Sequence, residues 1–188
     1  AVWAAYRASA PLERHWYEVI RENRPCHLYL DLEFCAVSFP RADGNGLVDA
    51  VLRALRLELE RRFGLAVQYE SQLLELDSSS ATKFSRHLVL RLPGLAWATN
   101  AHLGRFVRQV VRRAGEAAML RGDGGGSEGD GDDGICCGRM PRRSHCVVDT
   151  SVYSRNRHFR LPWSCKAGKT AVLVPTARFA ARGAAEGS

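Results

Sequence analysis

Two acidic residues in a strand-like segment are the first candidates for chemistry. In residues 27–34 (HLYLDLEF), Asp31 and Glu33 alternate with apolar residues, so both side chains leave one face of a strand, with alpha carbons about 6–7 Å apart. Carboxylates so placed can hold the divalent metal ions of a phosphoryl-transfer site, which usually needs a third acid. Asp149 is the best third candidate, because it follows the apolar residues 146–148. The alternative is that Asp31 and Glu33 lie on a solvent-facing strand surface.

A second strand-like segment, residues 83–92 (KFSRHLVLRL), carries hydrogen-bond donors. Lys83, Ser85 and His87 share one face of this strand, and three donors facing one way suit a cluster of anionic oxygens. Ser85 and His87 with an acid could also form a hydrolase triad, but no GxSxG sequence surrounds Ser85. The structural alternative is a Ser and a His satisfied within a polar sheet face.

Positive charge is concentrated in one segment. The chain has 27 Lys and Arg against 20 Asp and Glu, a net charge of +7, and residues 139–169 alone hold eight basic residues and one acid. Within residues 153–169 basic side chains are interleaved with aromatic ones, a combination that suits phosphates and bases: Arg155, Arg157, Arg160, Lys166 and Lys169 with Tyr153, Phe159 and Trp163. The segment predicts a polyanionic partner, and the alternative is a solvated basic arm.

Length and composition favour one globular domain. The chain has 188 residues, of which 46% are hydrophobic, which excludes a wholly disordered chain or a rod. No apolar run approaches the roughly 20 residues of a membrane span and no signal peptide is evident, so we expect a soluble intracellular protein with reduced cysteines. Residues 121–134 (RGDGGGSEGDGDDG) are predicted to be a disordered insertion. The pieces on either side, residues 1–120 and 135–188, are expected to build one fold.

Periodicity predicts the elements that position these residues. Helical spacing of apolar residues covers residues 47–63, with Gly64 as the C-cap, and a second helix reaching Leu120, with Thr99 or Asn100 as the N-cap. Strands are expected at residues 27–34, 72–76, 83–92 and 146–149. Residues 158–163 and 170–174 are expected to pair as a hairpin that turns at Ala167 and Gly168. The order predicts an α+β fold around a largely antiparallel sheet.

Taken together, three segments resemble the motifs of the archaeo-eukaryotic primase superfamily, most closely its eukaryotic PrimPol branch. They are HWYEVIRENRPCHLYLDLEF, LDSSSATKFSRHLVL and VDTSVYSRNRHFRLPWSCKAGKTAVL, in this order. The resemblance covers most of residues 3–174, the Gly/Asp-rich insertion excepted. It implies an α+β primase catalytic core with an RRM-like, mainly antiparallel mixed sheet flanked by helices, and it implies template-directed nucleotidyl transfer.

The resemblance also assigns roles to individual residues. Asp31, Glu33 and Asp149 are implied to be the catalytic acids, which bind Mn²⁺ or Mg²⁺ in a two-metal site. The incoming nucleotide is implied to be held by Lys83, Ser85, Arg86, His87, Arg157, His158, Arg160 and Lys166. His158 departs from the Asn usual at its position, although an imidazole can still donate a hydrogen bond.

Partners and location follow from the same resemblance. The family implies repriming at stalled replication forks and translesion synthesis, with single-stranded DNA template and primer and with dNTP or NTP as substrates. It implies a monomer without membrane contact, in the nucleus and mitochondrion, with a plastid as a further possibility.

Three family features are expected to be absent from this chain. They are most of the N-terminal module, the C-terminal zinc-binding region and the tail that binds a single-stranded-DNA-binding protein, so zinc is expected only outside this chain. Two other functions stay open. A non-catalytic nucleic-acid-binding module of primase-like fold would not need the acids, and a metal-dependent nuclease would not need Lys83, Ser85 and His87 as a triphosphate cradle.

Overall fold

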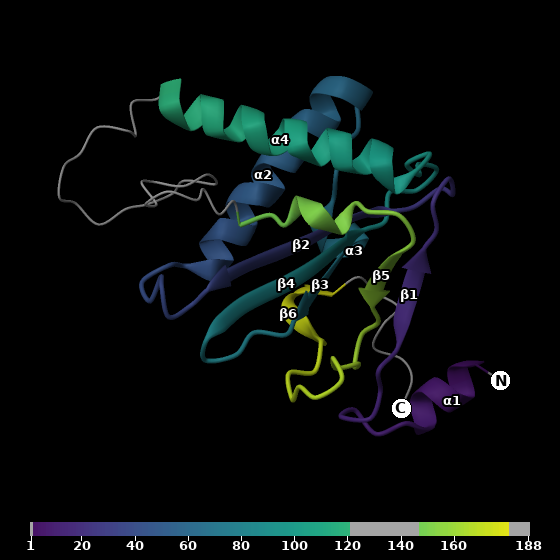
Figure 1. The fold of residues 1–188 in the computed structure, drawn as a ribbon. Coiled ribbons are helices and arrows are strands. Elements are labelled where there is room, and N and C mark those ends of the chain that lie inside the picture. Colours follow the sequence, from purple (N-terminus) through teal and green to yellow (C-terminus); the bar gives the residue numbers. More distant parts are fainter. Residues whose placement is uncertain (1, 121–146, 181–188) are drawn as a thin grey trace.

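The computed structural model describes residues 2–120 and 147–180. Two antiparallel sheets and two long helices dominate this part of the chain (Figure 1). The elements are α1 (Val2–Ala8), β1 (Tyr17–Ile20), β2 (Leu28–Cys35), α2 (Gly44–Phe63), α3 (Tyr69–Gln72), β3 (Leu73–Asp77), β4 (Lys83–Leu90), α4 (Asn100–Leu120), the 3-10 helix η1 (Thr150–Val152), β5 (Arg157–Arg160) and β6 (Val174–Ala180).

The larger sheet has the strand order β2-β4-β3-β6, and every ladder in it is antiparallel. On the free edge of β2, Val148 forms an antiparallel bridge with Leu32, so residues 147–149 extend the sheet beyond β2. The chain therefore runs β2, α2, β3, β4, α4 and then this short edge segment, which is a β-α-β-β-α-β connection. The predicted α+β class with an RRM-like antiparallel sheet flanked by helices is confirmed.

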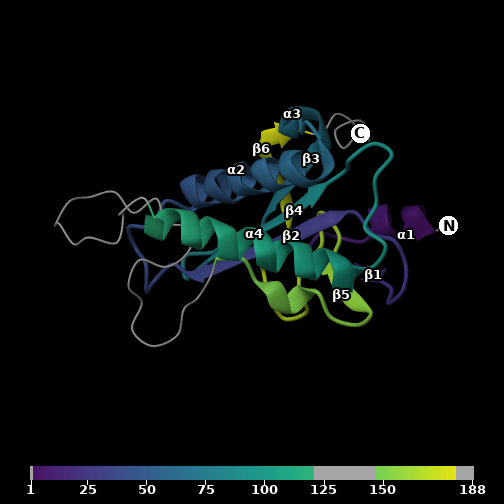
Figure 2. The ribbon, with the colours of Figure 1, turned by 90° about the horizontal axis from the view of Figure 1, so that it is seen from above.

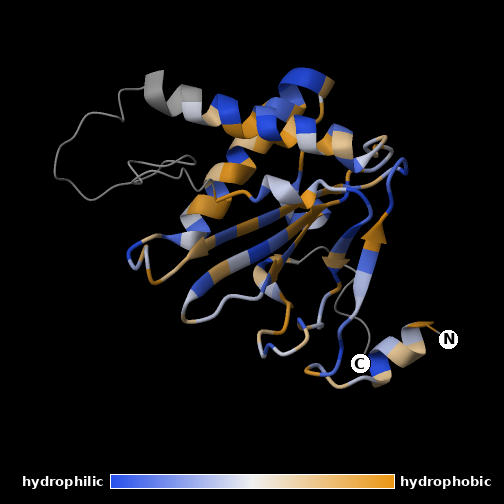
Figure 3. Cartoon of the chain, in the orientation of Figure 1, coloured by the Kyte–Doolittle hydropathy of each residue, from blue (hydrophilic) through white to orange (hydrophobic). Residues whose placement is uncertain are grey.

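Helices α2 and α4 cover one face of the larger sheet, which we call the helix face (Figure 2). Alternating apolar residues of the strands meet the apolar stripes of both helices there, and Figure 3 shows these stripes along β2 and β4. The buried residues are Leu28, Leu30, Leu32, Leu88 and Leu90 from the strands, Val48, Val51, Leu52, Leu55 and Leu59 from α2, and Leu103, Phe106, Val107 and Val110 from α4. This core fixes which side chains of the strands point the other way.

The predicted helices are found, with small shifts at their ends. Helix α2 begins three residues early, at Gly44, because the side chain of Asp43 caps it by accepting a hydrogen bond from Asn45 N at 3.1 Å. It ends as predicted, with Gly64 in the left-handed region at φ 63°. At α4, Thr99 is the capping residue, since its hydroxyl accepts from His102 N at 3.2 Å.

The predicted hairpin of residues 158–163 and 170–174 is wrong. Strand β5 instead pairs with β1 in a separate two-stranded sheet, and β6 pairs with β3 at the edge of the larger sheet. Each run has strand-like alternation, which cannot identify its partner, and both partners here lie about 100 residues or more away in sequence. Gly168 does turn the chain, at φ 71°, but within the connection between the two sheets.

Some predictions fall on residues that the structure does not describe. The insertion of residues 121–134 lies wholly outside the described residues, as do Cys136, Cys137 and Cys146. Strands β5 and β6, which follow that segment, pair with strands that precede it. No helix in residues 2–120 or 147–180 has the length and apolar character that a membrane crossing requires.

Candidate active site

The three predicted metal-binding acids meet on the face of the larger sheet opposite the helices, which we call the site face. Asp31 and Glu33 are two residues apart on β2, so they share this face. Asp149 N donates to Asp31 O at 2.8 Å, and Glu33 N donates to the carbonyl of residue 147 at 2.8 Å. This register puts Asp149 directly opposite Asp31, at an alpha-carbon separation of about 5.5 Å. The structure thus brings the three acids together.

Asp31 is buried, in contrast to the alternative of a solvent-facing strand surface. It is 8% exposed, and Oδ1 has no hydrogen-bond partner among the described residues. Burial, and then the charges of Glu33 and Asp149, raise the pKa of Asp31 to about 6. The side chain of Glu33 is 38% exposed. A buried carboxylate beside two further acids is costly unless a cation joins them.

The donor set suits a hard divalent cation, which prefers carboxylate oxygens. Oδ1 of Asp31 has no hydrogen-bond partner among the described residues, so this atom is free to bind a cation. The other two carboxylates have protein partners: Glu33 pairs with Lys83, and Asp149 Oδ1 accepts from Ser151 N at 2.9 Å. Among the described residues no three acidic, His or Cys side chains are already grouped as a metal site. Each of these two contacts, to Lys83 and to Ser151, uses one oxygen of its carboxylate, so the other oxygen is left for a cation.

The predicted donors of β4 lie beside the acids. In the antiparallel register, Ser85 is opposite Glu33 and His87 is opposite Asp31, so both side chains reach the site face and both are buried. His87 Nε2 is 3.8 Å from Asp31 Oδ1. Burial, followed by the charges of nearby cations including Arg160 and Lys166, lowers the pKa of His87 to about 3. His87 is therefore a neutral imidazole at physiological pH.

Cations from the basic segment act electrostatically on Asp31 and His87. Arg160 is 5% exposed; its Nη2 donates to Ser78 Oγ at 2.7 Å and its Nη1 to Ala171 O at 3.0 Å. Burial lowers the pKa of Arg160, and the charge of Asp31 opposes that shift. Lys166 acts electrostatically on both Asp31 and His87, and Arg157 acts on His87.

Two predicted nucleotide-binding residues are not brought to this group. Arg86 lies on the helix face, because it alternates with Ser85 and His87, and it pairs there with Glu75 and Asp77. His158 is exposed, and its ring faces Tyr17 with ring centroids 6.2 Å apart. The structure therefore gives Arg86 a structural environment rather than a place at the acids. The alternation of side chains along β4 already predicts that Arg86 points away from the face that carries Ser85 and His87.

Helix α4 and β2 hold the segment that carries Asp149. A Cβ atom on Gly104 would lie 2.6 Å from Cβ of Tyr153, so only glycine allows this close approach. Asn100 Nδ2 donates to Ser154 O at 2.7 Å, and the Tyr153 hydroxyl donates to Tyr29 O at 2.8 Å. These contacts fix η1, whose N-cap is Asp149.

Two residues that contact the predicted site were not among the predicted site residues, although Phe159 was named as one of the aromatic residues of the basic segment. Phe159 packs on the His87 ring, with centroids 4.5 Å apart and planes 30° apart, and also contacts Tyr29. Ser78 accepts the hydrogen bond from Arg160 described above, and its Oγ donates to Ser85 Oγ at 3.2 Å. Ser78 is one of three successive serines in the DSSS sequence of residues 77–80, and nothing in that pattern distinguishes it.

Comparisons with known proteins agree with the motifs. No family model matches the chain. The chain is 32% identical over 191 residues to a protein of Danio rerio named DNA-directed primase/polymerase protein, which covers 92% of this chain and 36% of that relative. Proteins of the same name from Mus musculus and Homo sapiens are 32% and 30% identical, over 92% and 93% of this chain and 37% and 40% of their own lengths.

The chain therefore spans about two fifths or less of these curated relatives. The similarity covers 92–93% of this chain. The chain is a homologue of the DNA-directed primase/polymerase proteins over the part of them that it spans, as its three motifs predicted.

Proposed function

We propose that this chain is part of the catalytic core of a primase and polymerase that performs metal-dependent, template-directed nucleotidyl transfer. The observation that carries the proposal is the convergence of Asp31, Glu33 and Asp149 on one sheet face, with the buried cation Arg160 close enough to act electrostatically on Asp31. Negative and positive groups in one place suit a divalent metal together with a triphosphate. The names of the relatives support the same class of reaction.

Each group has a role that its environment supports. Asp31, Glu33 and Asp149 would hold Mn²⁺ or Mg²⁺, which when bound supplies Lewis-acid stabilisation of the attacking 3′-hydroxyl and the pyrophosphate leaving group. Ser85 and neutral His87 donate hydrogen bonds to the nucleotide without adding charge. Lys83 binds phosphate once it is released from Glu33.

The arginine and lysine of the third motif complete the phosphate pocket. Arg160 is buried and faces neutral partners, so its charge is available to an anion. Lys166 adds positive potential at Asp31, and both Lys166 and Arg157 add it at His87. Positive groups that are already in place when charge develops on the leaving pyrophosphate lower the barrier to transfer.

The proposal extends to the whole protein. We propose single-stranded DNA template and primer with dNTP or NTP as its partners and substrates, and repriming and translesion synthesis in the nucleus and mitochondrion as its role. Interaction with a single-stranded-DNA-binding protein and a zinc site are assigned to regions other than this chain. These statements rest on the family resemblance and on the names of the relatives.

Primer extension with Mn²⁺ tests the reaction. The wild-type chain is compared with Asp31→Ala/Glu33→Ala and with a control, Glu22→Ala/Glu70→Ala, which removes two exposed acids away from the site. We expect loss of at least about 100-fold in extension for the first variant and no more than about twofold for the control. Binding of a fluorescent dNTP without DNA is measured in parallel.

The outcomes separate the rival functions. Nucleotide binding without DNA supports a polymerase over a nuclease, since a nuclease has no triphosphate substrate. A wild-type chain that binds DNA but neither binds nucleotide nor extends a primer would overturn the proposal in favour of a non-catalytic nucleic-acid-binding module. Equal extension by the wild-type chain and the Asp31→Ala/Glu33→Ala variant would remove the acids from the mechanism.

A further inference from the structure

Ser78 connects two predicted nucleotide-binding residues that come from different motifs. Its hydroxyl accepts from Arg160 Nη2 at 2.7 Å and donates to Ser85 Oγ at 3.2 Å. Ser85 belongs to β4 of the larger sheet, whereas Arg160 ends β5 of the two-stranded sheet. A hydroxyl has one donor and two acceptor positions, so one side chain can make both contacts.

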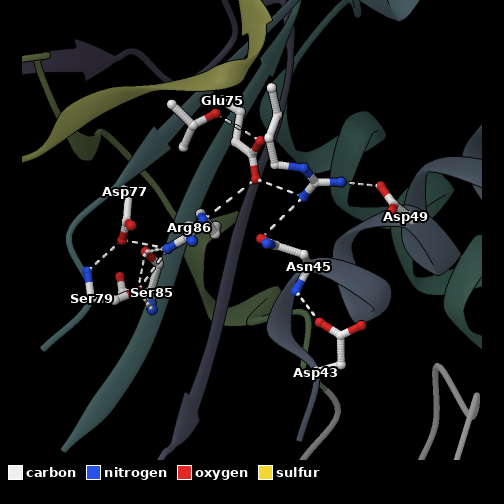
Figure 4. A network of polar contacts seen from close by, with 10 residues as sticks. Asp43, Asn45, Asp49, Glu75, Asp77, Ser79, Ser85 and Arg86 are labelled. Carbon is white, nitrogen blue, oxygen red and sulfur yellow. Dashed lines mark hydrogen bonds and ion pairs between the residues drawn. The ribbon is translucent and has the colours of Figure 1, made fainter. Parts of the chain in front are cut away.

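The backbone around Ser78 is itself firmly placed. Ser78 N donates to Ser85 O at 3.1 Å, which puts Ser78 opposite Ser85 just past the end of β3. Asp77 Oδ1 accepts from Ser79 N at 2.6 Å, and Ser79 Oγ accepts from Ser85 N at 3.0 Å. Figure 4 shows Asp77, Ser79 and Ser85 gathered beside Arg86. The Ser78 hydroxyl is thus held in position before any ligand binds.

Arg160 depends on this contact because its other partners are few. The guanidinium is almost fully buried, and in the described part of the chain no carboxylate lies within ion-pair distance of it. Its Nη1 donates to a backbone carbonyl, and its Nε has no partner there. Two neutral oxygens therefore fix the side chain, and no ion pair in the described part of the chain occupies its charge, which suits an anionic ligand.

We propose that Ser78 is a positioning residue for the triphosphate of the incoming nucleotide, holding the Arg160 guanidinium beside the Ser85 hydroxyl so that both face one anion. This inference rests on the proposed function of the site. Ser78 itself does not touch the nucleotide; it acts through Arg160 and Ser85. Groups held in place before binding lose less conformational freedom when the ligand arrives, which raises affinity.

Nucleotide affinity of the wild-type chain and its Ser78 variants tests this role. We expect Ser78→Ala to raise the Kd for a fluorescent dNTP about fivefold to tenfold, the loss of one hydrogen bond that orders a charged group. Ser78→Thr keeps the hydroxyl and should stay within about twofold of wild type. Ser80→Ala is the matched control, because Ser80 is exposed and its hydroxyl forms hydrogen bonds with the neighbouring Thr82.

A double-mutant cycle shows whether the effect passes through Arg160. In an Arg160→Lys background, which keeps a cation but removes the second guanidinium donor, Ser78→Ala should change the Kd by less than about twofold. In primer extension, Ser78→Ala should raise the KM for nucleotide and leave kcat within about twofold. Thermal unfolding of each variant confirms that it is folded.

Failure of the inference and failure of the proposed function look different. If wild type binds nucleotide and Ser78→Ala binds equally well, the inference is overturned and the proposed function stands. An effect of Ser78→Ala that persists fully in the Arg160→Lys background, or that Ser78→Thr does not rescue, also overturns it. Absence of nucleotide binding by the wild-type chain overturns both.

Discussion

Buried charges lie on both faces of the larger sheet. Those on the helix face are paired with opposite charges, whereas Asp31 on the site face is not fully paired. On the helix face, Glu75 is fully buried and lies 3.4 Å from both Arg86 Nε and Arg178 Nη1, and it accepts from Thr176 Oγ1 at 2.8 Å. Arg178 also pairs with Asp49 of α2 (Figure 4). On the site face, buried Asp31 lies beside two further acids, and one of its oxygens has no partner among residues 2–120 and 147–180.

The charges around Glu75 on the helix face stabilise the fold, whereas those around Asp31 on the site face are available to bind a ligand. Glu75 has two cations close by, so its burial is compensated within the chain. Asp31, His87 and Arg160 each have a pKa shifted by burial toward the neutral form. Such groups cost stability in the free protein and are the ones expected at a functional site.

Breaking the contacts that Glu75 makes with Arg86 and Arg178, which we call the helix-face network, should give the largest loss of stability. Glu75→Ala leaves Arg86 and Arg178 without their shared buried partner, and we expect the free energy of unfolding to fall by about 3–5 kcal/mol. Urea unfolding measures this. Glu75→Gln, which keeps the volume and can still accept from Thr176, should lose less. A loss under about 1 kcal/mol for Glu75→Ala would show that the network does not hold the fold together.

Removing the charge of Asp31 should instead increase the free energy of unfolding. A folded-state pKa of about 6, raised from 3.8, means that ionisation of Asp31 destabilises the fold as pH rises from about 4 to 6. Asp31→Asn should therefore stabilise the metal-free protein by up to about 3 kcal/mol at pH 7.5 and by nothing below pH 4. Thermal unfolding against pH measures this.

Asp31→Asn also tests whether the acids on the site face bind a metal ion. Mn²⁺ should raise the Tm of the wild-type protein, because a ligand that binds only the folded state stabilises it. Asp31→Asn should lose most of that increase, together with primer extension. A metal-dependent increase in Tm that is equal in both proteins would place the metal elsewhere.

Glu58, which lies outside both of these groups, tests whether ion pairing is enough to make a buried charge stabilise the fold. Glu58 on α2 accepts from Arg61 and Arg62 of the same helix and from Arg113 of α4, at 2.9–3.2 Å. These hydrogen bonds, that of Arg61 first, lower its pKa to about 2 despite partial burial.

Glu58→Gln should cost about 1–2 kcal/mol, discounted because its partners are partly exposed. Since the folded-state pKa is lowered, the stabilisation is complete above about pH 4.5 and lost as pH falls through 2. The difference between the variant and wild type in urea unfolding should shrink accordingly between pH 5 and pH 2. A constant difference over that range would contradict an electrostatic origin.

The smallest effect is expected at an exposed pair. Glu22 contacts Arg155 at 2.8 Å, but their side chains are 45% and 77% exposed. Glu22→Gln should change the free energy of unfolding by less than about 0.5 kcal/mol. A larger change would mean that burial is not what separates the strong pairs from the weak ones.

Much of the site could be predicted from strand alternation. Asp31 and Glu33, and Ser85 and His87, were placed on shared faces by their spacing alone, and the register between β2 and β4 makes those faces the same. The same rule excludes Arg86, which was assigned with its motif neighbours instead of by its position in the alternation. The motif resemblance grouped Arg86 with Ser85 and His87, whereas the structure places its side chain on the other face of the sheet, and its role in nucleotide binding stays a prediction.

Strand partners could not be predicted in the same way. The runs containing His158 and Thr170 looked like neighbours in a hairpin, yet β5 pairs with β1 and β6 with β3. Local alternation reports that one face of a strand is buried and says nothing about which edge it meets. The hydrogen-bond partner of Arg160, Ser78, depends on that pairing and was missed for the same reason.

By itself, the sequence determined the α+β class, the two long helices, the C-cap Gly64 of the first, the strands that carry the acids and the family to which the chain is related. These depend on periodicity, capping residues and motifs, which are properties of neighbouring residues. Only the tertiary structure decided that Asp149 lies opposite Asp31, that Asp31 is buried with a free oxygen, and that Ser78 joins Arg160 to Ser85. Those facts depend on which distant strands meet, and long-range pairing is settled by the packing of the whole sheet.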